Sequence, residues 1–211
     1  MQLLDKDIIN KAFSLLGLKL EKNKIIARIC VYGGSALLFI STIKRMSADI
    51  DYRIIELKSI NSEFSEYSSL INKFRKILLE IKEELNLPED WMNDGVKGFI
   101  STDEILSDEI TFGDGSLTVI FPSLEYILAM KCIAMRSVDE SVHDKNDIKL
   151  LIKELNIKDH NKVFDIVQKF YPEKFILPKT SLGILEILQE IENENNRSNK
   201  NATNFPSFSP Q

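Results

Sequence analysis

A glycine pair followed by two closely spaced carboxylates constrains this chain more than any other feature. An apolar run over residues 25–32 ends at Gly33-Gly34-Ser35, a second apolar run follows, and Asp49 and Asp51 come shortly after it. In an extended strand these two side chains point to the same face, because side chains alternate along a strand. Two carboxylates on one face suit Mg²⁺ that also holds a phosphate. The small turn residues let backbone N–H groups approach phosphate oxygens at a helix N-terminus.

This pattern resembles the nucleotidyltransferase superfamily, whose signature is a glycine–serine turn followed by an Asp-x-Asp strand. The similarity is closer to the abortive-infection type of bacterial nucleotidyltransferase toxins and their uncharacterised relatives. Those proteins share Gly-Gly-Ser-Ala-Leu, a spacer, and then Arg-x-Ser-x-Asp-Ile-Asp. Here residues 33–37 read Gly-Gly-Ser-Ala-Leu and residues 45–51 read Arg-Met-Ser-Ala-Asp-Ile-Asp. The alternative interpretation is a solvated strand end preceded by a glycine turn.

A lysine stands in an otherwise apolar stretch further along the chain. Lys131 lies within residues 126–135, so its ammonium group either reaches out to solvent or is directed at a ligand. The composition of the stretch leaves both interpretations open. The resemblance favours a ligand, because the toxin family has a Leu-Ala-x-Lys-x-x-Ala helix and residues 128–134 match it.

Two further acids follow this lysine. The toxin family has Arg-Asp-x-x-Asp-Leu at the start of the next helix, and this chain has His143 followed by Asp144 and Asp147. Histidine therefore replaces the family's arginine. On the residues alone, Asp144 is equally well a helix N-cap and Asp147 an acid of the first turn.

Many nucleotidyltransferases have a third carboxylate on a later strand. The strand expected over residues 117–121 contains no acid. Asp94 is the preferred substitute, because it lies in Trp-Met-Asn-Asp-Gly-Val, a segment similar to one in the uncharacterised relatives. Asp108 and Glu109 are the other candidates.

Periodicity and turn residues predict an α+β fold. Strands are expected over residues 25–32 and 48–55 and in a hairpin around Gly113-Asp114-Gly115-Ser116, and helices dominate after residue 122. The resemblance implies a nucleotidyltransferase-like mixed sheet with flanking helices. The predicted divisions are a nucleotidyltransferase-like α/β domain, a helical C-terminal domain and a disordered tail rich in Asn, Ser and Pro, at residues 1–121, 122–192 and 193–211.

Composition is that of a globular protein in a reducing compartment. The 211 residues are 44% hydrophobic and carry a net charge of −5, which argues against a constitutive coat on nucleic acid but leaves room for a local basic groove. The first residues do not resemble a signal peptide, and no apolar stretch is long enough for a membrane helix. We therefore expect a cytoplasmic protein with no membrane partner, in which Cys30 and Cys132 are buried free thiols.

The resemblance implies transfer of a nucleoside monophosphate from a nucleoside triphosphate to an acceptor, with Mg²⁺ or Mn²⁺ as cofactor. An RNA 3′ end such as that of a tRNA is the favoured acceptor, and a protein hydroxyl or a small molecule stays open. The implied setting is a toxin–antitoxin or phage-defence system, with a cognate antitoxin as partner. The alternative is a non-catalytic binding or regulatory protein with the same fold.

Each site residue has an expected role. The expected catalytic residues are Asp49, Asp51, Lys131 and Asp144. The expected nucleotide-binding residues are Gly33, Gly34, Ser35, Arg45, Ser47 and Asp147. The expected metal ligands are Asp49, Asp51 and Asp94.

Overall fold

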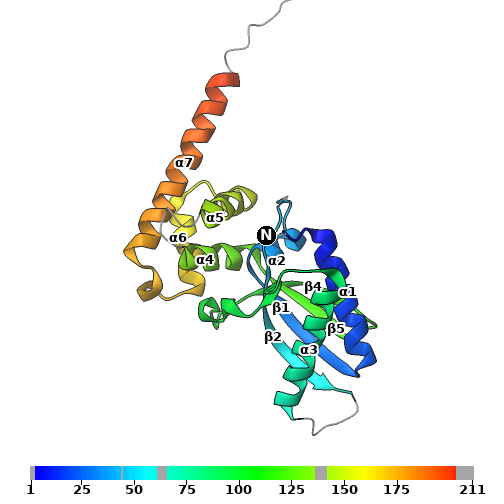
Figure 1. The fold of residues 1–211 in the computed structure, drawn as a ribbon. Coiled ribbons are helices and arrows are strands. Elements are labelled where there is room, and N and C mark those ends of the chain that lie inside the picture. Colours follow the sequence, from blue (N-terminus) through cyan, green and yellow to red (C-terminus); the bar gives the residue numbers. More distant parts are fainter. Residues whose placement is uncertain (1–2, 44, 61–65, 136–141, 203–211) are drawn as a thin grey trace, which may run out of the picture.

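The computed structural model describes residues 3–43, 45–60, 66–135 and 142–202 (Figure 1). In chain order the elements of the N-terminal part are α1 (Lys6–Lys22), β1 (Ile25–Val31), α2 (Gly33–Ile40), β2 (Ile50–Ser59), α3 (Tyr67–Leu85), β3 (Met92–Asn93), the 3₁₀ helix η1 (Gly95–Phe99), β4 (Leu106–Phe112) and β5 (Leu117–Pro122). The C-terminal elements are α4 (Leu124–Ala134), α5 (Val142–Glu154), α6 (His160–Phe170), the 3₁₀ helix η2 (Glu173–Phe175) and α7 (Pro178–Ala202).

The strands form one mixed sheet in the order β3-β2-β1-β5-β4. β1 pairs antiparallel with β2 and parallel with β5, and β4 and β5 form the predicted antiparallel hairpin. β3 pairs in parallel with the start of β2. The α+β prediction is therefore confirmed at the level of a mixed sheet with flanking helices.

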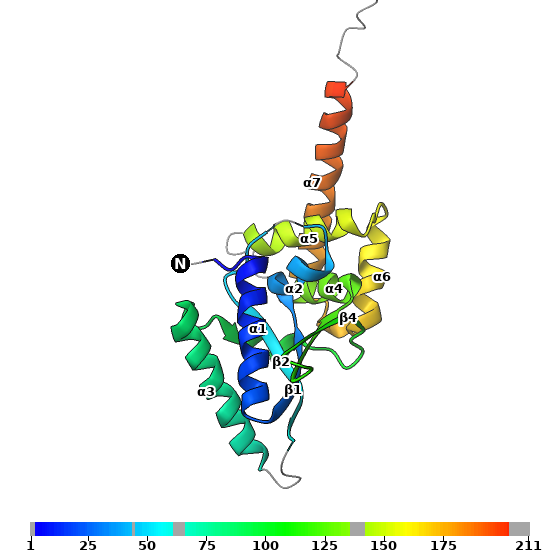
Figure 2. The same cartoon turned by 90° about the vertical axis from the view of Figure 1, so that its right-hand side faces the viewer.

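Helices α1 and α3 pack against each other and against the sheet (Figures 1 and 2). Aromatic side chains fill this layer: the rings of Phe13 and Phe112 lie 5.8 Å apart, and those of Tyr52 and Phe74 lie 6.0 Å apart. α2 contacts β2, β5 and α4, so it links the sheet to the helical part. Cys30 and Cys132 are buried and free, as predicted.

In the helical part, α4 packs against α5 and α6, and α7 contacts α4, α5 and α6 (Figure 2). The predicted domain boundary, between residues 121 and 122, falls before the last residue of β5, and the buried side chains on its two sides belong to one hydrophobic cluster. No helix among the described residues combines the length and the apolar character needed to cross a bilayer.

Two elements differ from the sequence prediction. β3 was not expected, because a two-residue strand is too short to have a period. α7 extends to Ala202, so residues 193–202 are helical where a disordered tail was predicted. The rest of that predicted tail, residues 203–211, lies outside the described residues.

A close backbone contact offers a test of the packing. A Cβ at Gly17 of α1 would lie 2.8 Å from the backbone of Phe112 and Gly113, whereas a Cβ at Gly98 would meet nothing within 4 Å. We expect Gly17→Ala to lower the free energy of unfolding by about 1–3 kcal/mol, because overpacking pushes α1 away from the hairpin. Gly98→Ala is the matched control for urea denaturation, and an equal loss in both variants would contradict this packing.

Candidate functional site

A cavity of about 560 Å³ opens between the start of α2, the start of β2, the β3–η1 segment and α4. Of the predicted nucleotide-binding residues, it is lined by Gly33, Gly34, Arg45 and Ser47. Of the predicted catalytic residues, it is lined by Asp49, Asp51, Lys131 and Asp144. Residues from the strand-rich part and the helical part thus meet around one hollow.

The two aspartates reach the cavity because of their spacing. Asp51 lies in β2 and Asp49 directly precedes the strand, while Ile50 between them is fully buried. The carboxylate of Asp51 lies against Gly33, where an added Cβ would be only 2.9 Å from Asp51 Oδ2. Gly33 also has φ +62°, a conformation that favours glycine. Glycine is therefore required here both for the turn and for the room that Asp51 occupies.

Asn93 holds the other carboxylate in place. Its Nδ2 donates a hydrogen bond of 2.9 Å to Asp49 Oδ2, and its Oδ1 accepts one of 2.9 Å from the backbone N–H of Gly95. Asn93 stands opposite Asp51 in the β2–β3 pairing, and it lines the cavity. The sequence prediction passed over Asn93 in favour of its neighbour Asp94, although both belong to the same Trp-to-Val segment.

The structure does not bring Asp94 to the aspartate pair. Asp94 forms an ion pair with Lys97 and lines a separate pocket. Asp108 and Glu109 lie on β4, at the opposite edge of the sheet from β3. Within the described part of the chain, no three His, Cys, Asp or Glu side chains are grouped as a metal site. The expected third carboxylate ligand is therefore absent from this cluster, and an amide occupies the adjacent position.

Lys131 and Arg45 are joined by a buried acid. Lys131 Nζ lies 2.9 Å from Asp144 Oδ1 and 2.9 Å from Asp147 Oδ2, and Arg45 forms an ion pair with Asp147. Asp147 is only 5% exposed and does not line the cavity. The guanidinium of Arg45 lies across Gly34, where an added Cβ would be 2.5 Å from its Nη2. Asp147 thus lies behind the two cations, rather than facing a ligand in the cavity.

The two predicted serines lie in different surroundings. Ser35 is buried, and its Oγ donates to the carbonyl of Tyr32 at 3.0 Å, so it supports the first turn of α2 without lining the cavity. Ser47 lines the cavity, and its backbone pairs with Leu4 through hydrogen bonds of 2.7 and 2.9 Å. The chain just before α1 therefore anchors the loop that leads to Asp49.

The charges around the cavity act on one another. Burial, together with the neighbouring charge of Asp49, raises the pKa of Asp51 to about 6, and Lys131 partly opposes this rise. Burial lowers the pKa of Lys131, but Asp147 and Asp144 outweigh it and raise that pKa above its ordinary value. Two crowded carboxylates beside cations fit a divalent metal that would also hold phosphate oxygens.

The raised pKa of Asp51 has a measurable consequence for stability. An acid whose folded-state pKa is raised destabilises the fold above that pKa, and the penalty fades as the pH falls towards the unfolded value of about 4. Without metal, we expect Asp51→Asn to stabilise the protein by about 1–3 kcal/mol at pH values above about 6. The gain should shrink between about pH 6 and pH 4 in urea titrations. An unchanged gain across that window would contradict the crowding of Asp51.

Comparison with known proteins adds no relative. No protein-family model, curated protein or solved structure matches the chain. A function for this chain is therefore inferred from its own motifs and from the geometry of the cavity. That geometry combines a carboxylate pair, two ion-paired cations and a glycine turn around one hollow.

Proposed function

We propose that this chain is a metal-dependent nucleotidyltransferase that moves a nucleoside monophosphate from a nucleoside triphosphate to an acceptor hydroxyl. The observation that carries the proposal is the meeting of Asp49 and Asp51 with Lys131 and Arg45 around one cavity. These groups come from segments far apart in the sequence, so their meeting is not a by-product of local spacing. A volume of about 560 Å³ lies within the range of small-molecule sites.

Asp49 and Asp51 would hold Mg²⁺ or Mn²⁺, which supplies charge neutralisation for the triphosphate and activation of the acceptor hydroxyl when bound. Asn93 keeps Asp49 in a fixed orientation through its hydrogen bond. Lys131 and Arg45 would neutralise charge on the departing pyrophosphate. Gly33 and Gly34 would let backbone N–H groups at the start of α2 approach phosphate oxygens.

The favoured acceptor is the 3′ end of an RNA such as a tRNA, with a protein hydroxyl or a small molecule as the other classes. This preference, and the role as a toxin with an antitoxin partner, come from the resemblance of the motifs. The deciding experiment supplies each nucleoside triphosphate, labelled at the α-phosphate, together with total RNA or total protein. A transferase would be contradicted if no label is transferred to RNA, to protein or to any of a panel of small hydroxyl compounds.

One observation favours the alternative of a non-catalytic nucleotide-binding protein. Among the described residues, no third acid joins Asp49 and Asp51 in a group that could hold a metal ion, and both cavity cations already have carboxylate partners. Titration of Mn²⁺ with and without nucleoside triphosphate separates binding from catalysis. Mutual enhancement of metal and nucleotide binding without any label transfer would favour the alternative.

We expect Asp51→Asn to reduce transfer by about 100-fold or more, because one charge-stabilising group in a catalytic site contributes on that scale. Asn93→Ala should reduce transfer or metal affinity by about 10–100-fold, since it removes the group that orients Asp49. Asp108→Asn is the control, because Asp108 is an exposed acid on the opposite edge of the sheet. Rates are measured with the acceptor identified above, after circular dichroism shows that each variant is folded. Full activity of Asp51→Asn at saturating metal would refute the assignment.

A further inference from the structure

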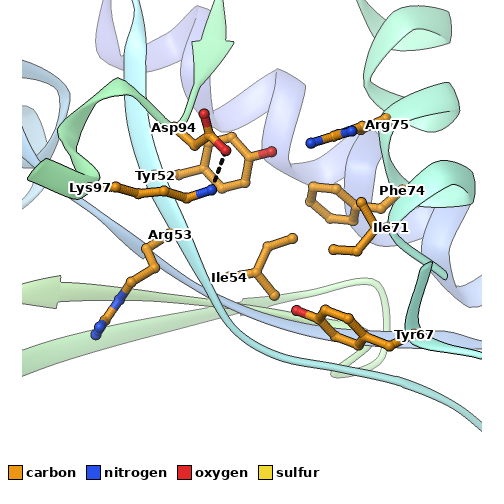
Figure 3. Close-up of a pocket in the computed structure, with 9 residues that line it drawn as sticks. All are labelled: Tyr52, Arg53, Ile54, Tyr67, Ile71, Phe74, Arg75, Asp94 and Lys97. Atoms are coloured by element: carbon orange, nitrogen blue, oxygen red, sulfur yellow. Dashed lines mark hydrogen bonds and ion pairs between the residues drawn. The ribbon is translucent and has the colours of Figure 1, made fainter.

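A second hollow, which we call the Tyr52 pocket, lies between β2, α3 and the segment that contains η1 (Figure 3). Its volume is about 330 Å³. Apolar and aromatic side chains form its walls, namely Tyr52, Ile54, Tyr67, Ile71 and Phe74. Charged side chains complete the lining, namely Arg53, Arg75, Asp94 and Lys97. None of these residues belongs to the cavity described above.

Two hydrogen-bond donors in this pocket have no protein partner among the described residues. Tyr52 as a residue is only 7% exposed, and its hydroxyl makes no hydrogen bond to another described residue. Figure 3 shows this hydroxyl and the guanidinium of Arg75 directed towards each other, and no acceptor lies between them. Arg75 makes no ion pair within the described part of the chain, whereas Lys97 is paired with Asp94. Arg75 is exposed, so both donors are open to a ligand from solvent, and a cation beside an O–H donor suits an anionic or carbonyl oxygen.

The Tyr52 hydroxyl keeps its proton at neutral pH. Burial and the charge of Asp94 raise the pKa of Tyr52 to about 12, although Arg75 opposes the rise. Tyr52 therefore offers an O–H donor next to the positive charge of Arg75.

The remaining surface of the pocket suits a flat ring. Tyr67 is 58% exposed, its ring stacks on no other aromatic ring of the described residues, and Ile54 and Ile71 supply apolar contact beside it. A ring joined to an anionic phosphate is the chemistry of a nucleotide. Stacking on exposed aromatic side chains together with backbone contacts to cations is how proteins hold single-stranded nucleic acid.

The Tyr52 pocket adjoins the catalytic cavity through neighbouring residues. Asp51 lines the cavity and Tyr52 lines the pocket, and the same holds for Asn93 and Asp94. Because successive side chains alternate between the faces of a strand, the two hollows open on opposite sides of the β2–β3 edge. β3 is the edge strand of the sheet and has only two residues. A flexible chain therefore has to cross only a short edge to reach both hollows.

We propose that the Tyr52 pocket binds a nucleotide that precedes the 3′ end of a single-stranded RNA acceptor. This inference rests on the proposed function, because it takes the acceptor to be RNA and its 3′ hydroxyl to lie near Asp51. Arg75 and the Tyr52 hydroxyl contact the phosphate, and the base lies against Tyr67.

The test measures binding of a short single-stranded RNA, labelled at its 5′ end with fluorescein, by fluorescence anisotropy without metal or nucleoside triphosphate. We expect Arg75→Ala and Tyr67→Ala each to weaken binding about fivefold or more, the scale of one lost stacking or charged contact. Tyr52→Phe keeps the ring that packs on Phe74 and should weaken binding about threefold, because it removes one hydrogen-bond donor. Lys76→Ala is the control, since it removes one charge from the same helix outside the pocket.

The outcomes separate this inference from the proposed function. Equal RNA affinity of Arg75→Ala, Tyr67→Ala and Lys76→Ala would overturn the pocket as an RNA site, even if Asp51→Asn abolishes transfer. RNA binding that depends on Arg75 and Tyr67 supports the pocket even if no nucleotide is transferred, in which case only the proposed function fails. Transfer to protein rather than RNA, with RNA affinity unaffected by Arg75→Ala, would also overturn it.

Discussion

The geometry of the cavity depends on the ion pairs of one buried carboxylate, that of Asp147. It lies on α5 and binds Lys131 of α4 and Arg45 of the loop before β2, so one acid connects the helical part to the sheet. A second connection lies nearby, where Glu154 of α5 accepts hydrogen bonds of 2.9 and 2.6 Å from the backbone and hydroxyl of Thr42. Removal of one member of a buried ion pair typically costs about 3–5 kcal/mol, because its partner is left charged without compensation. Loss of Asp147 would therefore remove the carboxylate partner of Arg45, leave Lys131 paired only with Asp144 among the described residues, and loosen the wall of the cavity.

Under the proposed function, the charges of this arrangement favour binding of metal before nucleotide. The immediate surroundings of the cavity contain Asp49, Asp51, Asp144 and Asp147, with Lys131 and Arg45 as the opposing charges. Acids outnumber bases, so a triphosphate alone meets net repulsion at short range. Under the proposed function, a divalent cation at the aspartate pair would cancel the excess negative charge, so nucleotide binding would depend on metal. An acidic protein can select a highly charged anion in this way without a basic surface.

The features that sequence patterns predicted are those that depend on the geometry of a short segment. The spacing of Asp49 and Asp51 puts both side chains on one face, although the cavity over that face is formed by distant segments, and the hairpin follows from its glycine-rich turn. Asp94 was misplaced because neighbouring residues of an extended segment face opposite sides, so a shift of one residue exchanges Asn93 for Asp94. The end of α7 was misplaced because long-range pairs hold it: Glu194 lies 3.3 Å from Lys149 and 2.8 Å from Lys153 of α5. Such pairs between helices leave no trace in the composition of the tail.

Trp91, at the start of the segment between the two hollows, has a further consequence. It is the single tryptophan of the chain, it is 2% exposed, and its carbonyl accepts a hydrogen bond of 2.8 Å from the backbone N–H of Ile50. The residues that follow it reach the cavity through Asn93 and the Tyr52 pocket through Asp94. Intrinsic tryptophan emission of the unmodified protein therefore originates at the boundary between both hollows. The chain contains its own optical reporter for any rearrangement that a ligand in either hollow imposes on this edge of the sheet.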